Sequence, residues 1–197
     1  MPSSNKCTMA RRRNGAIFSA CAVLILALLC AGVTASVHYG LRDAFAASDA
    51  ALDEAKGGAQ RKLLFPDATS FEAQSAPAVD GLNSVYKADT GAWVFDVTSA
   101  QGYHGDVELM VGINADGTVA GLQVVAEDET DGIGTNALTE EYFGGFAGTA
   151  AAGELTVDEA GAGQTHVDAV SGATFTSRAV VDCLNIAFAA YAQMGGN

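Results

Sequence analysis

The chain has 197 residues and a formal net charge of −13, enough length for one globular domain and an additional segment. All 23 acidic residues follow residue 40, together with only six of the ten Lys and Arg residues, so this part carries a net charge of −17. Such an acidic surface repels the phosphates of nucleic acids and of anionic lipid headgroups, which argues against nucleic acid as a partner and predicts a domain that stands away from the bilayer surface.

Residues 16–37 predict a transmembrane helix, because this stretch contains no charged residue. As a helix it would extend about 33 Å, enough to cross a hydrocarbon core of about 30 Å. The basic segment 1–15, with Arg11, Arg12 and Arg13, would stay in the cytoplasm, which places the acidic remainder outside. We therefore expect a single-pass protein of the cell membrane, held in the lipid bilayer through residues 16–37.

A cleaved signal peptide is the alternative interpretation of this stretch, with "VTAS" offering small residues for processing. The apolar run is longer than a usual signal core, and no Ala-x-Ala occurs near its end, so a retained anchor is favoured. A lipoprotein is less favoured still. A lipid-attachment signal has a small residue directly before the modified cysteine, whereas the bulky Leu29 precedes Cys30.

Residues 38–91 are expected to form a juxtamembrane helix and a connecting segment. The helix covers residues 41–64, is weakened at Gly57-Gly58, and ends at Pro66. Residues 67–88 contain Pro77 and Asp80-Gly81 and are expected to have little regular structure.

A change to strand patterns at Ala92 marks the start of the predicted domain, residues 92–194. Strands are predicted at 92–99 and 106–113, where Val107, Leu109, Val111 and Ile113 alternate on one face. The turn signal "NADG" at 114–117 precedes a further strand at 118–127, which indicates an antiparallel hairpin. Trp93 and Phe95 are expected to fill the core.

The remainder predicts an acidic loop at 127–137 and a short helix capped by Thr139. A short strand at 155–157 and a helix over 178–194, whose apolar residues recur at helical spacing, follow. The expected fold class is α+β, with a twisted, mainly antiparallel sheet and flanking helices. Cys183 is the only cysteine beyond residue 37, which excludes an internal disulfide there, and the three histidines show no metal-ligand spacing, so no metal site is expected.

The stretch "DAVSGATFTS" (168–177) precedes the last helix and has two interpretations from the residues alone. It is either a strand–turn–helix junction, with the turn at Gly172 and Thr176 or Ser177 as N-cap, or an anion site. A hydrolase elbow needs Gly-x-Ser-x-Gly and a P-loop needs Gly-Lys-Ser/Thr, and neither occurs. In an anion site, Gly172 and Ala173 leave room for a phosphate, hydroxyls and Arg178 surround it, and a threonine oxygen could itself be esterified.

"DAVSGAT" resembles the flavinylation signature Asp-x-x-Ser/Thr-Gly-Ala-Thr of FMN-binding domains, such as the G subunit of the Rnf electron-transport complex and the C subunit of the sodium-pumping NADH:quinone reductase. In that family a flavin transferase attaches FMN through its phosphate to the last threonine, here Thr174. "QGYHGDVELMVGINADGTVAGLQVVAEDETDGIGT" and "RKLLFPDATSFE" are also similar to family segments. Two positions depart from the pattern: Asp131 replaces a common proline, which should loosen its loop slightly, and His104 replaces a small residue.

The resemblance implies a set of site residues without a catalytic one. Thr174 would carry covalent FMN. Two alternatives to a flavin contact remain open: Tyr103 is an aromatic residue at a strand edge, or Glu129 is a solvated surface charge. The attachment segment would contribute Asp168, Ser171, Gly172, Ala173, Thr176 and Ser177, and the facing wall Gly102, Tyr103, Glu129, Thr130, Gly132, Ile133 and Gly134.

The implied function is an electron-carrier subunit of an Rnf-type ion-translocating oxidoreductase of the ferredoxin:NAD type, with other membrane subunits as partners and no net turnover of its own. One alternative is a stand-alone membrane-anchored flavoprotein that reduces a small acceptor or serves extracellular electron transfer. Another is an anchored binding domain without a cofactor.

Overall fold

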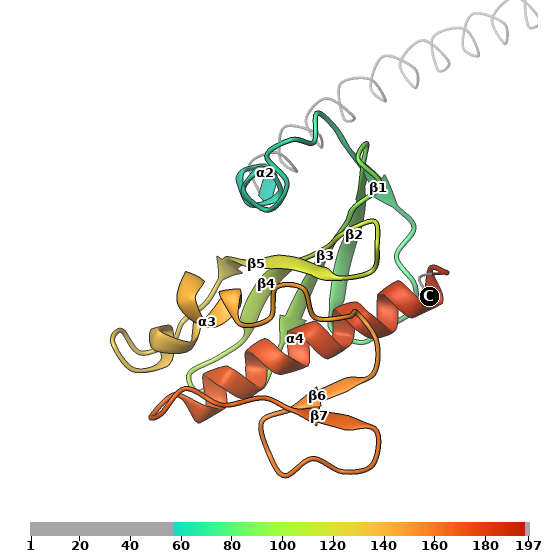
Figure 1. Ribbon diagram of the computed structural model, residues 1–197. Coiled ribbons are helices and arrows are strands. Elements are labelled where there is room, and N and C mark those ends of the chain that lie inside the picture. The colour runs from blue at the N-terminus through green and yellow to red at the C-terminus, as the bar shows by residue number, and fades with distance from the viewer. Residues whose placement is uncertain (1–56, 196–197) are drawn as a thin grey trace, which may run out of the picture. The chain divides into compact units, whose positions relative to one another are not determined.

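A computed structural model describes residues 57–195 (Figure 1). The predicted cytoplasmic segment 1–15, the transmembrane segment 16–37 and most of the juxtamembrane helix lie outside these residues. Within residues 57–195, no helix combines the length and the apolar character that a bilayer crossing requires. The elements are α2 (Ala59–Leu64), β1 (Phe71–Gln74), β2 (Leu82–Ala88), β3 (Trp93–Ser99), β4 (Val107–Ile113), β5 (Val119–Ala126), the 3-10 helix η2 (Gly134–Ala137), α3 (Glu140–Gly144), β6 (Glu154–Thr156), β7 (Gln164–His166) and α4 (Thr174–Gln193).

The main sheet contains β1 to β5 in sequence order, and each strand is antiparallel to its neighbours. The predicted hairpin is confirmed: β4 and β5 are joined by a turn in which the Asn114 amide donates to the Thr118 carbonyl at 2.7 Å. Gly117 has a φ of 82°, a conformation that a residue with a Cβ rarely adopts. The α+β class and the mainly antiparallel sheet are therefore as predicted.

The expectation of little regular structure in residues 67–88 is wrong, because this segment contains β1 and β2. β2 pairs with β3 through Val85 opposite Phe95 and Tyr86 opposite Val94, so the sheet begins well before Ala92. Pro77 and Gly81 lie in the connection between the two strands, not inside them. The same residues that indicated an irregular segment therefore mark the loop of a hairpin.

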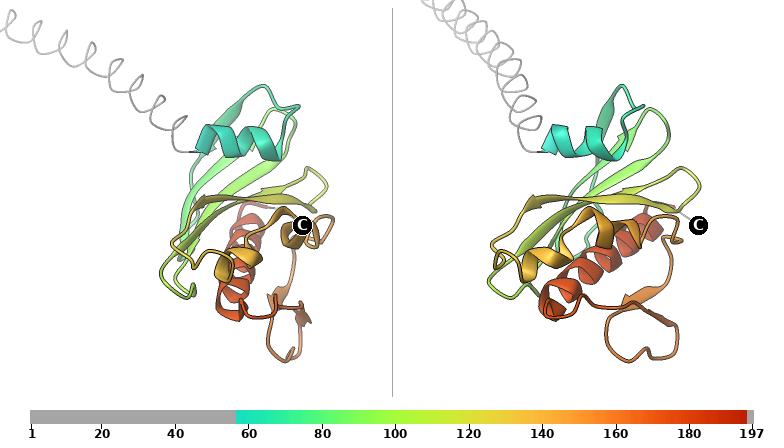
Figure 2. Two further views of the ribbon diagram at one scale, coloured as in Figure 1. Left: turned by 90° about the vertical axis from the view of Figure 1, so that its left-hand side faces the viewer. Right: turned by 60° about the vertical axis from the view of Figure 1, so that its left-hand side comes forward.

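One face of the sheet packs against α4, which lies across the strands (Figures 1 and 2). All four predicted alternating residues of β4 are fully buried there, and Phe95 makes an edge-to-face contact with Tyr191 at 6.2 Å between ring centroids. The predicted apolar face of the helix is confirmed, since all its members are buried: Val180, Val181, Leu184, Phe188 and Tyr191.

α2 covers part of the other face of the sheet, on the side opposite α4 (Figure 2). Leu64 and Phe65 pack against buried Tyr86, Val94 and Met110. A Cβ on Gly112 would approach the Phe65 ring to 3.1 Å, so the missing side chain lets α2 lie close to the strands. The central strands are consequently buried on both faces, which explains their nearly continuous apolar sequence.

The last helix begins earlier than predicted. α4 starts at Thr174, with Ala173 at the N-cap position and no side chain capping it, so neither Thr176 nor Ser177 is the N-cap. By contrast, Thr139 caps α3 as predicted, since its hydroxyl oxygen accepts from the Tyr142 amide at 3.3 Å.

Candidate functional site

The segment before α4 presents Thr174 at the start of a 20-residue helix. Gly172 has a φ of 84° and makes the turn, after which the Ala173 amide donates to the Val170 carbonyl at 2.9 Å. The buried Ser177 hydroxyl accepts from the Val170 amide at 3.0 Å and fixes this turn against the helix. Thr174 is exposed, and the amides of the first helical turn, which have no partner within the helix, lie beside it.

Glu129 joins three separate parts of the chain at this end of the molecule. One carboxylate oxygen accepts from the amides of Tyr103 (2.8 Å) and His104 (3.2 Å), and the other accepts from the Thr176 hydroxyl at 2.5 Å. The side chain is only 8% exposed, so the interpretation of Glu129 as a solvated charge is wrong. The loop after β3, the acidic loop and the first turn of α4 thus converge on one buried carboxylate.

Two of the predicted glycines are required by this carboxylate. A Cβ on Gly102 would lie 2.7 Å from one Glu129 oxygen and 2.2 Å from the Gly105 carbonyl, and a Cβ on Gly134 would lie 2.5 Å from the other oxygen. Neither space accommodates a methyl group without displacement. Gly102 and Gly134 are therefore small because the backbone passes directly over the Glu129 side chain.

A cavity of about 320 Å³ opens beside Thr174, within the size range of small-molecule sites. Thr174 itself is flanked by residues of its wall on both sides along the chain. The wall contains many of the predicted residues, with one addition: Tyr103, Glu129, Thr130, Ile133, Gly134, Gly172, Ala173, Thr176 and, unpredicted, Phe175.

Three exposed apolar side chains belong to this wall. Tyr103, Ile133 and Phe175 are 63%, 55% and 52% exposed, although large apolar groups usually bury most of their surface. The rings of Tyr103 and Phe175 lie 5.7 Å apart, and His104 stacks on Tyr103 at 5.4 Å. Tyr103 lies outside any strand, so the strand-edge interpretation is wrong. A large aromatic directly after Thr174 is the signal that would have identified Phe175.

Other predicted residues lie away from the cavity wall. Gly132, with a φ of 71°, shapes the acidic loop, and its amide donates to the Thr135 hydroxyl. Ser171 is exposed, and Ser177 is buried beneath the turn. Asp168 is exposed beside His166, with 3.6 Å between a carboxylate oxygen and the His166 Nε2, and both residues line a second, larger cavity near Tyr142.

Arg178 does not supply its charge to the attachment turn. Its guanidinium forms two hydrogen bonds with Asp158 in the β6–β7 connection, at 2.6 and 3.2 Å. This pairing lowers the pKa of Asp158 and raises the pKa of Arg178. Among residues 57–195, no group of three or more His, Cys, Asp or Glu residues is arranged to hold a metal ion.

Comparison with known proteins places this site in context. The family model of the FMN-binding domain matches residues 102–189. The G subunit of the ion-translocating oxidoreductase complex of Cronobacter sakazakii is 34% identical over 188 residues, which cover 82% of this chain and 88% of that protein. The chain belongs to the family of these G subunits. The corresponding G subunit from Methanosarcina acetivorans is also 34% identical, over 64% of this chain and 70% of the relative.

One further relative and one solved structure have more specific names. The G subunit of the Na(+)-translocating ferredoxin:NAD(+) oxidoreductase complex of Acetobacterium woodii is 29% identical, over 68% of this chain and 73% of that protein. The C subunit of the Na(+)-translocating NADH-quinone reductase from Parabacteroides distasonis, a solved structure, is 22% identical with a TM-score of 0.46, over 57% of this chain and 61% of that chain.

Proposed function

We propose that this protein is an electron carrier of a membrane-bound ion-translocating oxidoreductase complex, and that it carries FMN esterified through its phosphate to Thr174. The observation that carries the proposal is the position of Thr174, exposed at the first residue of α4 and flanked by the cavity wall. Membership of the family of G subunits and the match to the FMN-binding domain support it.

The residues present fit such a group. The phosphate would be held by the free amides of the first turn of α4, where Gly172 and Ala173 carry little or no side chain to obstruct it. The ring would lie against the apolar side chains of Tyr103, Ile133 and Phe175, whose exposure such a contact would reduce. When bound, FMN supplies one- and two-electron transfer, and the protein orients it and sets its electrostatic surroundings.

Maturation would proceed at the Thr174 hydroxyl. Its oxygen would form the new bond to the FMN phosphorus while the phosphoanhydride bond of FAD breaks, AMP leaves, and the hydroxyl proton passes to solvent. A dedicated flavin transferase would be needed, because a threonine hydroxyl is a weak nucleophile. The exposure of Thr174 leaves it accessible to such an enzyme.

The proposed setting is the outer side of the cell membrane. Residues 16–37 would anchor the chain, with the basic residues 1–15 in the cytoplasm. There a covalent ester retains the cofactor without a pool of free flavin. The partners would be other membrane subunits of the complex, and the ferredoxin:NAD type named for the relative from Acetobacterium woodii is the proposed class.

In-gel fluorescence tests the proposal. The full-length protein, produced together with an active flavin transferase, should fluoresce under ultraviolet light after denaturing electrophoresis, and Thr174→Ala should abolish the signal. Thr165→Ala, in β7, is the matched control and should keep it. Fluorescence that survives in Thr174→Ala would overturn the attachment site.

A further inference from the structure

Glu129 is a buried carboxylate in the wall of the cavity beside Thr174. Its three hydrogen-bond partners all donate to it, so both oxygens act as acceptors, which is the role of the ionised group. Within residues 57–195, the ion pairs involve other carboxylates, and no Lys, Arg or His side chain neutralises Glu129. The wall therefore contains a negative charge that amide and hydroxyl dipoles stabilise without cancelling it.

The other acidic residues of the same loop differ from Glu129 in exposure. Glu127, Asp128 and Asp131 are all exposed, and water and salt screen their charges. The buried charge of Glu129, in the cavity wall, is screened far less and acts more strongly on a group bound in the cavity. The acidic loop therefore contains the buried charge of Glu129 and also exposed acidic residues that serve as matched controls.

We infer that Glu129 lowers the reduction potential of the FMN in this cavity, an inference that rests on the proposed function. Two-electron reduction takes up two electrons from the reductant and one proton from water, which leaves the reduced ring with one negative charge. Repulsion from the Glu129 carboxylate disfavours that charge and shifts the potential to more negative values. Glu129 exchanges neither electrons nor protons in this role; it is a positioning and electrostatic residue.

The expected size follows from the dimensions of the cavity. Two unit charges within about 10 Å, at an effective dielectric constant of about 20, change an equilibrium constant on the order of tenfold. For a two-electron couple, a tenfold change corresponds to about 30 mV. Neutralising Glu129 should therefore raise the midpoint potential by about this amount.

Redox titration of the flavinylated full-length protein tests the inference, with potentials measured for wild type, Glu129→Gln, Thr176→Val and Asp131→Asn. Glu129→Gln should raise the potential by about 30 mV. Thr176→Val keeps the charge but removes one donor to it, so its potential should become more negative than that of wild type. Asp131→Asn, exposed in the same loop, should change the reduction equilibrium less than threefold.

The signs of the shifts separate this role from a structural one. Equal potentials for wild type and Glu129→Gln, or a lower one for the variant, would overturn the inference. If Glu129→Gln accepts no flavin, the Thr176→Val variant alone tests the inference. A midpoint potential of Thr176→Val that equals or exceeds that of wild type would then contradict it. Absence of covalent flavin in the wild type is a separate result, which contradicts the proposed function instead.

Discussion

Asn185 in α4 holds Leu155 in β6 through both ends of its side-chain amide. The amide oxygen accepts from the Leu155 backbone nitrogen at 2.8 Å, and the amide nitrogen donates to the Leu155 carbonyl at 2.9 Å. Leu155 is 5% exposed, so its backbone groups have little access to water. The pair fixes β6, and with it the segment that leads through β7 to the attachment turn, against α4.

Replacing Asn185 by Ala should destabilise the protein by about 2–3 kcal/mol, because two backbone groups of Leu155 would be left without partners. Urea unfolding followed by the fluorescence of Trp93, the only tryptophan in the sequence, measures this. Arg178→Ala removes the more exposed contact of the same region and should change the unfolding midpoint much less. A larger loss from Arg178→Ala than from Asn185→Ala would contradict this view of the β6–β7 segment.

Asp96 gives the stability a pH dependence. Burial, with repulsion from Glu108 as a second cause, raises the pKa of Asp96 from 3.8 to about 6. Between these values the folded protein retains a proton that the unfolded chain has lost, so the contribution of Asp96 to stability is fully present below pH 3.8 and is lost as the pH rises through 6.

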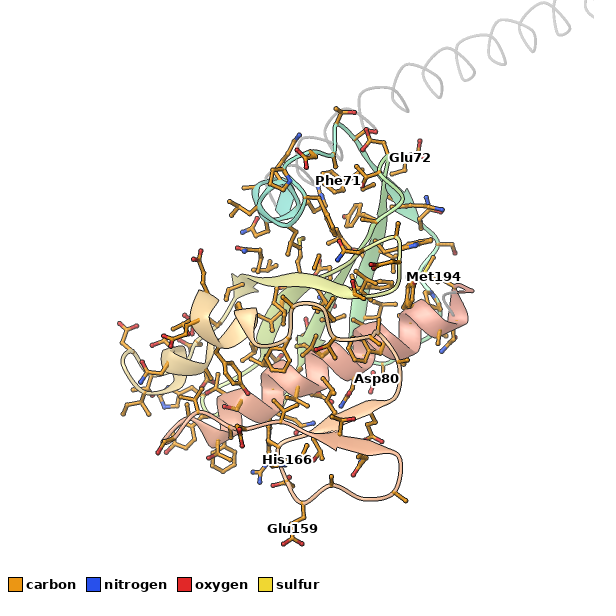
Figure 3. The ribbon with its side chains drawn as sticks, viewed as in Figure 1. Phe71, Glu72, Asp80, Glu159, His166 and Met194 are labelled. Carbon is orange, nitrogen blue, oxygen red and sulfur yellow. The ribbon has the colours of Figure 1, made fainter. Side chains whose placement is uncertain are left out.

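Asp96→Asn should therefore stabilise the protein near pH 7.5 by on the order of 1–2 kcal/mol and should have little effect near pH 4. The difference between the unfolding free energies of variant and wild type across this range is the measurement. Glu159→Gln, directed away from the domain at the far end of the β6–β7 loop (Figure 3), corrects for general charge effects. Parallel profiles for Asp96→Asn and wild type would show that the burial of Asp96 has no such consequence.

Gly134→Ala tests the close packing around Glu129. The new methyl group would lie 2.5 Å from a Glu129 oxygen and 3.0 Å from the Thr176 hydroxyl, and such overpacking costs about 1–3 kcal/mol. Gly105→Ala, in the facing loop with nothing within 4 Å, should stay within about 0.5 kcal/mol of wild type. Urea unfolding compares the two variants, and equal stabilities would refute the steric requirement at Gly134.

Cys183 should be unreactive in the folded protein. The residue is fully buried in α4, so a reagent has little access to its sulfur. Burial also raises the pKa of the thiol, so little of the reactive thiolate forms. Mass spectrometry of the peptide that contains Cys183 should show no maleimide adduct from the native full-length protein and complete labelling in guanidinium. Rapid labelling in the native state would mean that α4 opens readily.

Local patterns predicted the parts of the fold that local physics decides. The alternation in β4 and the "NADG" turn predicted a hairpin, and the helical spacing of Val180, Leu184 and Phe188 predicted the buried face of α4, although not its first residue. β1 and β2 were not predicted because these short segments gain stability only by pairing, β1 with β2 and β2 with β3, and neighbouring residues do not reveal such partners.

The candidate site was predicted as a set of residues but not as an arrangement. Burial of Glu129 depends on donors 25, 26 and 47 positions away along the chain, and no periodicity indicates such a meeting. The position of Asp168 in a neighbouring cavity follows from the path of β7, a strand absent from the prediction. The resemblance to FMN-binding domains therefore supplied the candidate residues, while tertiary packing decided which of them share a cavity.

The most direct test of the central claim is the mass of the proteolytic peptide that contains Thr174, taken from full-length protein made in a host with an active flavin transferase. We predict a peptide heavier by one FMN less one water, with fragment ions that place the addition on Thr174. An unmodified peptide, from cells in which the same transferase loads another flavoprotein, would contradict covalent FMN at this residue.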